Sequence, residues 1–163
     1  MVLAAVLGLG MAASSAATAE ENPSEVRQAA LDPRLNALQS FFRKFRSPLD
    51  QYAAAFLSAA DRHGLDWRLL PSLAMVESGG GRYCSRNNVF GWGNGRIHFQ
   101  SVQEGIAHVA SALANAPHYA RKDLIGKLRT YNPGHPAYPG KVLGFLQQLP
   151  LNPNPAPMAA GSR

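Results

Sequence analysis

The sequence predicts a mainly α domain with one small β-hairpin, and three observations lead to this prediction. Apolar residues recur at helical spacing, most clearly at positions 49, 52, 53, 56, 57 and 60. Helix-start signals such as Asp32-Pro33 and Ser47-Pro48 precede the periodic segments. Residues 82–100 lack this spacing, and Gly93-Asn94-Gly95 lies there between two short apolar runs, which is typical of a tight hairpin turn.

The sequence predicts six helices along the chain, of which those after residue 46 form a single domain at residues 47–149. Their ranges are 33–45, 48 to the stop at Gly64, 67–78, a helix opened by the capping box of residues 101–104, 123–131 and 137–149. Residues 20–46 form an N-terminal extension that contains the first of these helices. The Pro- and Ala-rich residues 150–163 are expected to be a disordered tail.

The first 19 residues are typical of a secretory signal peptide. An apolar run at residues 2–9 is followed by Ala17-Thr18-Ala19, which fits a cleavage site for small residues. The usual positive residues at the start are missing, so an uncleaved anchor or a frayed tail stays an alternative. The sequence therefore predicts export to the periplasm or the cell exterior.

Composition narrows the classes of partner and cofactor. The chain carries a net charge of +6, which favours anionic partners such as wall polymers, membranes or nucleic acid. Its Lys and Arg residues are scattered along the sequence, so we expect no nucleic-acid partner. The five histidines show no metal-binding spacing, and the single Cys84 cannot form an internal disulfide. We expect no metal and no cofactor.

One carboxylate among ten lacks a structural explanation. Nine are assigned to the polar leader, to helix caps or first turns, or to a solvent-facing position: Glu20, Glu21, Glu25, Asp32, Asp50, Asp61, Asp66, Glu104 and Asp123. Glu77 instead continues the apolar stripe of the helix at 67–78, near its C-terminal end. Lost hydration and the helix dipole both raise the pKa of a carboxyl there, as a general acid requires. The alternative is an ordinary last-turn Glu that reaches water.

Asn and aromatic residues cluster just after Glu77. The cluster is Tyr83, Asn87, Asn88, Phe90 and Trp92. Such a set is typical of sugar binding, in which rings stack on pyranose faces and amides bind hydroxyl or acetamido groups. An ordinary hairpin with its own small core would explain the same residues.

The chain resembles the bacterial endo-β-N-acetylglucosaminidases of glycoside hydrolase family 73, within the lysozyme-like superfamily. The segments that resemble the family's motifs are AMVESG at 74–79, NNVFG at 87–91, FQSVQEGI at 99–106, APHYA at 116–120 and YNPGHPAYPGKV at 131–142. The resemblance covers about residues 50–148. It departs from the family at Gly134-His135, where the family has Thr-Asp, and in lacking any Asp or Glu between Arg82 and Gln103.

The resemblance implies a lysozyme-like fold and cleavage of the β-1,4 bonds of peptidoglycan glycan strands. Glu77 would be the general acid, and Tyr131 would lie beside the reacting sugar. The substrate-binding residues would be Ser78, Asn88, Phe90, Trp92, Tyr119 and Tyr138. The three glycines 79–81 would let the backbone leave the helix close to a bound sugar. The protein would be a wall-associated monomer, acting alone or within a secretion or flagellar machine.

The missing second carboxylate leaves the reaction open. The substrate's own acetamido group could act as nucleophile, or Glu77 could serve as both acid and base and give an anhydro product, as in lytic transglycosylases. A catalytically inactive peptidoglycan-binding module of the same fold is the remaining alternative.

Overall fold

The computed structural model describes residues 32–153, and within them the predicted mainly α class is confirmed. The elements are α2 (Pro33–Lys44), the 3-10 helix η1 (Pro48–Tyr52), α3 (Ala53–Arg62), α4 (Leu69–Ser78), α5 (Val102–Asn115), α6 (Leu124–Tyr131) and α7 (Tyr138–Leu146). None of these helices has the length and apolar character needed to cross a bilayer. The predicted signal peptide at 1–19 and residues 154–163 of the predicted tail lie outside the described residues.

Side-chain caps determine where several helices start. Asp32 accepts a hydrogen bond from the Arg34 N–H at 2.8 Å, Ser101 accepts from the Glu104 N–H at 3.1 Å, and Asp123 accepts from the Gly126 N–H at 2.7 Å. Each cap satisfies a backbone donor that the first helical turn leaves without a partner. These three helices therefore start within about one residue of the predicted positions.

Two predicted helices begin differently in the structure. The helix expected from residue 48 opens with the five-residue η1, and α3 begins only at Ala53. The helix expected from residue 67 begins at Leu69, because Asp66 bonds both the backbone N–H and the side chain of Arg68 and holds a turn there. Both differences are local, and the apolar faces stay in place.

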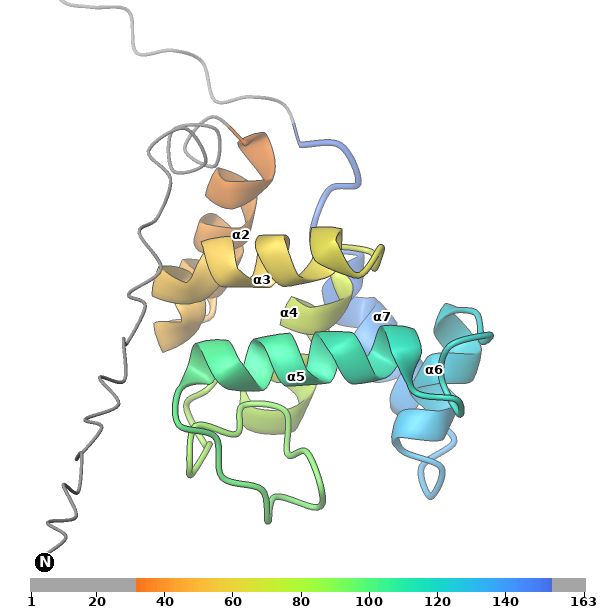
Figure 1. Ribbon diagram of the computed structural model, residues 1–163. Helices are drawn as coiled ribbons and strands as arrows, with labels where there is room; N and C mark the ends of the chain where they lie inside the picture. Colours follow the sequence, from red (N-terminus) through yellow and green to blue (C-terminus); the bar gives the residue numbers. More distant parts are fainter. Residues whose placement is uncertain (1–31, 154–163) are drawn as a thin grey trace, which may run out of the picture.

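Helix α4 is the central element of the core. Eight of its ten residues are buried, as expected for a helix that is apolar nearly all round. In Figure 1, α3 and α5 run across the front of the molecule, with α4 behind them and α7 beside it. Helix α4 packs most extensively against α7, while α2 covers η1 and α3, and α6 packs on α7. Glu77 therefore belongs to the most enclosed helix of the fold.

The predicted β-hairpin is wrong, since residues 82–100 contain no strand. Residues 86–99, which we call the 86–99 loop, close at a neck where the Phe99 N–H donates to the Arg86 carbonyl at 3.1 Å. The Asn88 amide donates to the Trp92 carbonyl at 2.9 Å and to the Ile97 carbonyl at 3.1 Å. These side-chain bonds occupy the groups that strand pairing would use, so the segment folds as a compact loop of the Ω type.

The chain leaves α4 through three consecutive glycines with positive φ, Gly79, Gly80 and Gly81. The exit is packed against protein. A Cβ built on Gly80 would lie 2.7 Å from the Ser47 Oγ and 2.7 Å from the Met75 Sδ, and one on Gly81 would lie 3.1 Å from the Leu49 side chain. The glycines are therefore required by close packing of the η1 region on the end of α4, and the expectation that they approach a sugar has no support here.

Replacement of Ser47 by Ala is expected to destabilise the protein by about 1–2 kcal/mol. The buried Ser47 hydroxyl donates to the Gly80 carbonyl at 2.6 Å and accepts from the Leu49 N–H at 3.1 Å, so one substitution removes both bonds. The free energy of unfolding in urea measures the effect. Ser58→Ala, at an exposed position of α3, is the control and should change stability little; equal stability of the two variants would contradict the prediction.

Candidate functional site

The Glu77 carboxylate lies where α4, α7 and the 86–99 loop meet. The Tyr138 hydroxyl donates to Glu77 Oε1 at 2.5 Å. The backbone of Gly91 lies close to the second carboxylate oxygen. A Cβ built on Gly91 would be 3.1 Å from Glu77 Oε2, so any residue other than glycine would have to displace the carboxylate or the loop. The side chain is half-buried, and its remaining open edge is the part that a ligand can approach.

Burial raises the pKa of Glu77 above the ordinary value of a glutamic acid, and the hydrogen bond from Tyr138 acts in the opposite direction. No charged residue contributes to this shift. The other described carboxylates are engaged elsewhere: Asp32, Asp50, Asp61 and Asp66 pair with arginines, and Glu104 and Asp123 accept backbone N–H bonds. Glu77 is therefore a lone carboxyl whose environment favours the protonated form.

The raised pKa of Glu77 also has a consequence for folding. The folded protein binds the Glu77 proton more tightly than the unfolded chain does, so ionisation of this group opposes folding. The stability that its protonation contributes is present below the unfolded pKa and is lost as the pH rises through the folded pKa. Such a cost, at a position that an apolar residue could fill, is characteristic of functional carboxyls.

Two stacked tyrosines connect Glu77 to the 86–99 loop. The Tyr138 and Tyr131 rings are nearly parallel, with centroids 5.8 Å apart and an interplanar angle of 6°. The Tyr131 hydroxyl donates to the Phe90 carbonyl at 2.7 Å. Burial raises the pKa of both phenols above the ordinary value, so both remain protonated hydrogen-bond donors at neutral pH. The stack thus holds the carboxylate on one side and the loop on the other.

Trp92 extends the aromatic group away from the carboxylate. Its ring centroid lies 5.6 Å from that of Tyr131 and 6.4 Å from that of Tyr119, and His108 of α5 contacts its edge. Trp92 and Tyr131 are only partly buried, whereas Tyr119 is 5% exposed. Trp92 and Tyr131 are therefore the two rings of this group with surface available for a sugar.

Five of the six residues expected to bind substrate lie in the interior, and only Trp92 is partly exposed; the buried ones are Ser78, Asn88, Phe90, Tyr119 and Tyr138. Three of the five support the 86–99 loop. Phe90 is fully buried and packs on Phe56, with ring centroids 6.2 Å apart. Ser78 donates to the Val89 carbonyl at 2.7 Å and accepts from the Gly81 N–H at 2.9 Å. Asn88 uses its whole amide group on the backbone of its own loop, including a 2.8 Å bond from the Trp92 N–H. These three side chains hold the loop in place and present no surface to a ligand.

Two residues have roles that the sequence did not indicate. Tyr138, expected to bind substrate, is 3% exposed and bonds Glu77 through its hydroxyl. Gly91 was not singled out, although the loop motif at 87–91 ends on it. Its contact with Glu77 joins residues 14 positions apart, and local spacing in the sequence carries no signal for such an approach.

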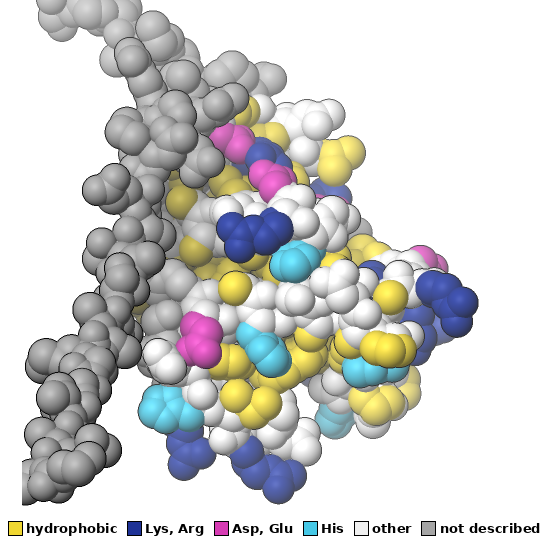
Figure 2. All heavy atoms as spheres, viewed as in Figure 1, with side chains coloured by type: hydrophobic (Ala, Val, Ile, Leu, Met, Phe, Trp, Pro, Cys, Tyr) yellow, Lys and Arg dark blue, Asp and Glu magenta, His cyan; other side chains and the backbone are white. Residues whose placement is uncertain are grey.

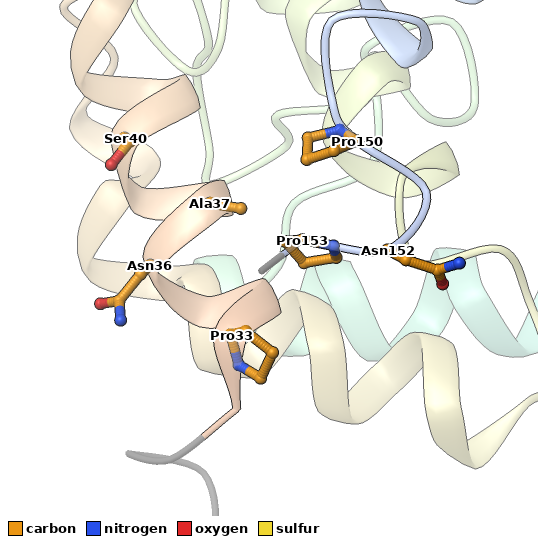
Figure 3. Close-up of a pocket in the computed structure, with 7 residues that line it drawn as sticks. All are labelled: Pro33, Asn36, Ala37, Ser40, Pro150, Asn152 and Pro153. Atoms are coloured by element: carbon orange, nitrogen blue, oxygen red, sulfur yellow. The ribbon is translucent and has the colours of Figure 1, made fainter. Parts of the chain in front are cut away.

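Two surface hollows among the described residues lie away from Glu77. One lies between α2 and residues 150–153 and is lined by Pro, Asn, Ala and Ser side chains (Figure 3). Another lies between α3 and the first half of α5, beside Arg62 and His63. Within residues 32–153, no group of three or more His, Cys, Asp or Glu side chains could hold a metal ion.

Comparison with protein-family models, with curated proteins and with solved structures finds no match to this chain.

Gly91→Ala is expected to destabilise the protein by about 1 kcal/mol more than Gly95→Ala. Both glycines have positive φ (59° and 73°), so the backbone strain of about 1–2 kcal/mol is common to the two substitutions. Only the Gly91 position faces the Glu77 carboxylate, because no atom lies within 4 Å of a Cβ on Gly95. Urea unfolding measures both losses.

A Glu77→Ala background provides the check on this difference. Once the carboxylate is removed, the two alanine substitutions should cost the same free energy of unfolding. A difference that persists in this background would mean that the extra cost of Gly91→Ala does not come from its contact with Glu77.

Proposed function

We propose that the protein is a lysozyme-like peptidoglycan hydrolase that cleaves β-1,4 bonds of the glycan strand with Glu77 as its general acid. The observation that carries the proposal is the lone Glu77 carboxyl, half-buried, with its pKa raised by burial and with no cation or second carboxylate acting on it. A general acid must hold a proton near neutral pH and release it to the leaving oxygen. Burial supplies the first condition, and the open edge of the side chain permits the second.

The aromatic group supports a sugar as the ligand. Trp92 and Tyr131 carry partly exposed rings in the aromatic group that also contains Tyr138, the hydrogen-bond donor to Glu77, and such rings stack on the apolar faces of pyranoses. The family resemblance of the segments at 74–79, 87–91 and 131–142 points to N-acetylglucosamine-containing strands. An exported, wall-associated location, suggested by the first 19 residues and the net charge of +6, is part of the same proposal.

The reaction would use a single protein carboxylate. Two-carboxylate glycosidases place their pair about 5–5.5 Å apart for retention or about 6.5–9.5 Å apart for inversion. Every other described carboxylate is held in an arginine pair or a helix cap, and none acts on the pKa of Glu77. Nucleophilic attack would therefore come from the substrate, through its 2-acetamido group or through a sugar hydroxyl.

A lytic transglycosylase is the second candidate, and the same observation favours it. In that reaction Glu77 first protonates the leaving oxygen and then, as carboxylate, accepts the proton of the sugar's own 6-hydroxyl. The bond to the leaving group breaks, an intramolecular ether forms, and no water is consumed. The product has a 1,6-anhydro end in place of a reducing end.

Glu77→Gln is expected to lower the rate of glycan cleavage by roughly 10²–10⁴-fold, the contribution typical of a general acid. The amide keeps the shape of the side chain and its bond from Tyr138 but has no acidic proton. Clearing of purified peptidoglycan measures the rate. Glu104→Gln, at an exposed capping position of α5, is the matched control and should retain activity.

Mass analysis of strands that the wild-type protein has cleaved distinguishes the two reactions. Reducing ends identify hydrolysis, and 1,6-anhydro ends identify transglycosylation. A wild-type protein that sediments with peptidoglycan but releases no fragment would overturn both and leave a binding module.

Tyr138→Phe is expected to shift the basic limb of the pH–rate profile to higher pH. The Tyr138 hydroxyl stabilises the ionised form of Glu77 and so lowers its pKa, which means that removing the hydroxyl raises the pKa. Because the protonated acid is the active form, activity should persist to higher pH. Tyr119→Phe removes another buried phenol without altering a bond to Glu77, and its profile should match the wild type. A downward shift in Tyr138→Phe would contradict this role.

A further inference from the structure

The surface next to the proposed site carries unbalanced positive charge. The segment from Ser78 to Gln103 contains Arg82, Arg86 and Arg96 and no Asp or Glu. All three arginines are exposed. The ion pairs among the described residues join Arg34, Arg43 and Arg68 to aspartates elsewhere, so these three arginines have no carboxylate partner within residues 32–153.

The Arg86 side chain reaches the backbone of Arg96 across the 86–99 loop. One Arg86 guanidinium nitrogen donates to the Arg96 carbonyl at 3.4 Å, which places the Arg86 side chain against the backbone of Arg96. At the lower end of the view, where Figure 1 shows this loop, Figure 2 shows Lys or Arg side chains together with His. The pair is therefore a local concentration of charge, in contrast to the scattered positives elsewhere in the sequence.

Hydrogen bonds within the 86–99 loop hold the backbone that carries the two arginines in one conformation. Asn87 donates from its side chain to the Phe99 carbonyl at 3.0 Å, and Asn88 bonds three backbone groups of the loop. Arg86 itself has a positive φ of 57°, a conformation that is uncommon for a long side chain and is more often occupied by Gly or Asn. Such strain persists where the surrounding structure imposes it, and it is frequent at binding sites.

The same loop also reaches the proposed catalytic group. Gly91 lies close to Glu77, since a Cβ built on it would be 3.1 Å from Oε2, and the Phe90 carbonyl accepts a hydrogen bond from the Tyr131 hydroxyl. One loop therefore carries the two arginines and borders the carboxylate. No arginine contributes to the pKa shift of Glu77, so the arginines do not perturb the acid. A ligand that lies at Glu77 and extends along the loop would meet their positive charge.

We propose that Arg86 and Arg96 bind the carboxylates of the peptide stems that branch from the glycan strand. The inference rests on the proposed function, because the strand must first lie at Glu77. The sugar backbone offers stacking faces and hydroxyls, whereas the stems supply planar carboxylates, which guanidinium groups bind through paired hydrogen bonds. The enzyme would then prefer peptide-bearing strands over bare ones.

The test compares the binding of two soluble substrates in a Glu77→Gln background, which prevents turnover. One is glycan strand with intact peptide stems. The other is the same strand after an amidase has removed the stems and the lactyl carboxylates exposed by that cleavage have been converted to methylamides, so that the bare strand carries no carboxylate. Arg86→Gln/Arg96→Gln should weaken binding of the peptide-bearing strand by about three- to tenfold, the range for two exposed ion pairs, and leave binding of the bare strand unchanged. Glutamine keeps the side-chain length and tolerates the backbone of residue 86 as arginine does, so the variant is expected to fold.

Arg46→Gln/Arg62→Gln is the charge-matched control, since both arginines are exposed, just after α2 and at the end of α3, and the variant should not affect either substrate. Equal losses on both strands, or no loss on the peptide-bearing strand, would overturn the inference. Inorganic polyphosphate is added as a competitor, and displacement of bare strand as readily as peptide-bearing strand would point to a general anion surface and also overturn it.

Cleavage by the wild-type protein separates failure of this inference from failure of the proposed function. If the protein cleaves both strands and binds them with equal affinity, the stem-recognition inference is wrong and the proposed function stands. Arginine-dependent binding of the peptide-bearing strand without any cleavage would remove the enzymatic function and leave the stem-recognition site.

Discussion

Burial of one carboxyl group between α4, α7 and the 86–99 loop is the constraint on which the rest of the structure depends. Helix α4 is otherwise apolar nearly all round, and within residues 32–153 Glu77 takes its side-chain hydrogen bond from Tyr138 at the start of α7. The loop must approach the second oxygen closely, which requires glycine at position 91. Tyr131 then joins the loop backbone to the Tyr138 ring, so that one hydrogen-bonded and stacked group spans three parts of the chain.

The rigidity of the loop explains why the predicted ligand residues divide into two groups. A loop without strand pairing must satisfy its backbone carbonyls and N–H groups in another way, since unsatisfied groups are costly. The buried side chains of Asn88 and Ser78 donate hydrogen bonds to loop carbonyls, and the Phe90 ring packs in the core beside Phe56. Trp92 and Tyr131 are held at the surface by this scaffold. The predicted ligand residues thus include some that support the site and others that can face a ligand.

The sequence predicted the helices well because their signals are local. Caps at Asp32, Ser101 and Asp123 and an apolar stripe such as that of residues 49–60 need only neighbouring residues. The hairpin prediction failed because Asn94-Gly95 is also compatible with an Asn-stabilised loop, and the deciding bonds from Asn88 span up to nine residues. Glu77 could be found by eliminating the other carboxylates. Its partner Tyr138 lies 61 residues further along the chain, and only the packing of α7 on α4 brings the two together.

The two tyrosines beside Glu77 also limit what can replace a second carboxylate in the proposed reaction. A phenol can act as base or nucleophile only as phenolate, and burial raises the pKa of both Tyr131 and Tyr138 above their ordinary values. Each hydroxyl already donates a hydrogen bond, to Phe90 or to Glu77, which an ionised oxygen could not do. Neither phenol can therefore supply the missing charge at neutral pH. In the proposed reaction the stabilising group would therefore come from the substrate itself, and the protein would contribute one acid, its placement and the rings that align the sugar.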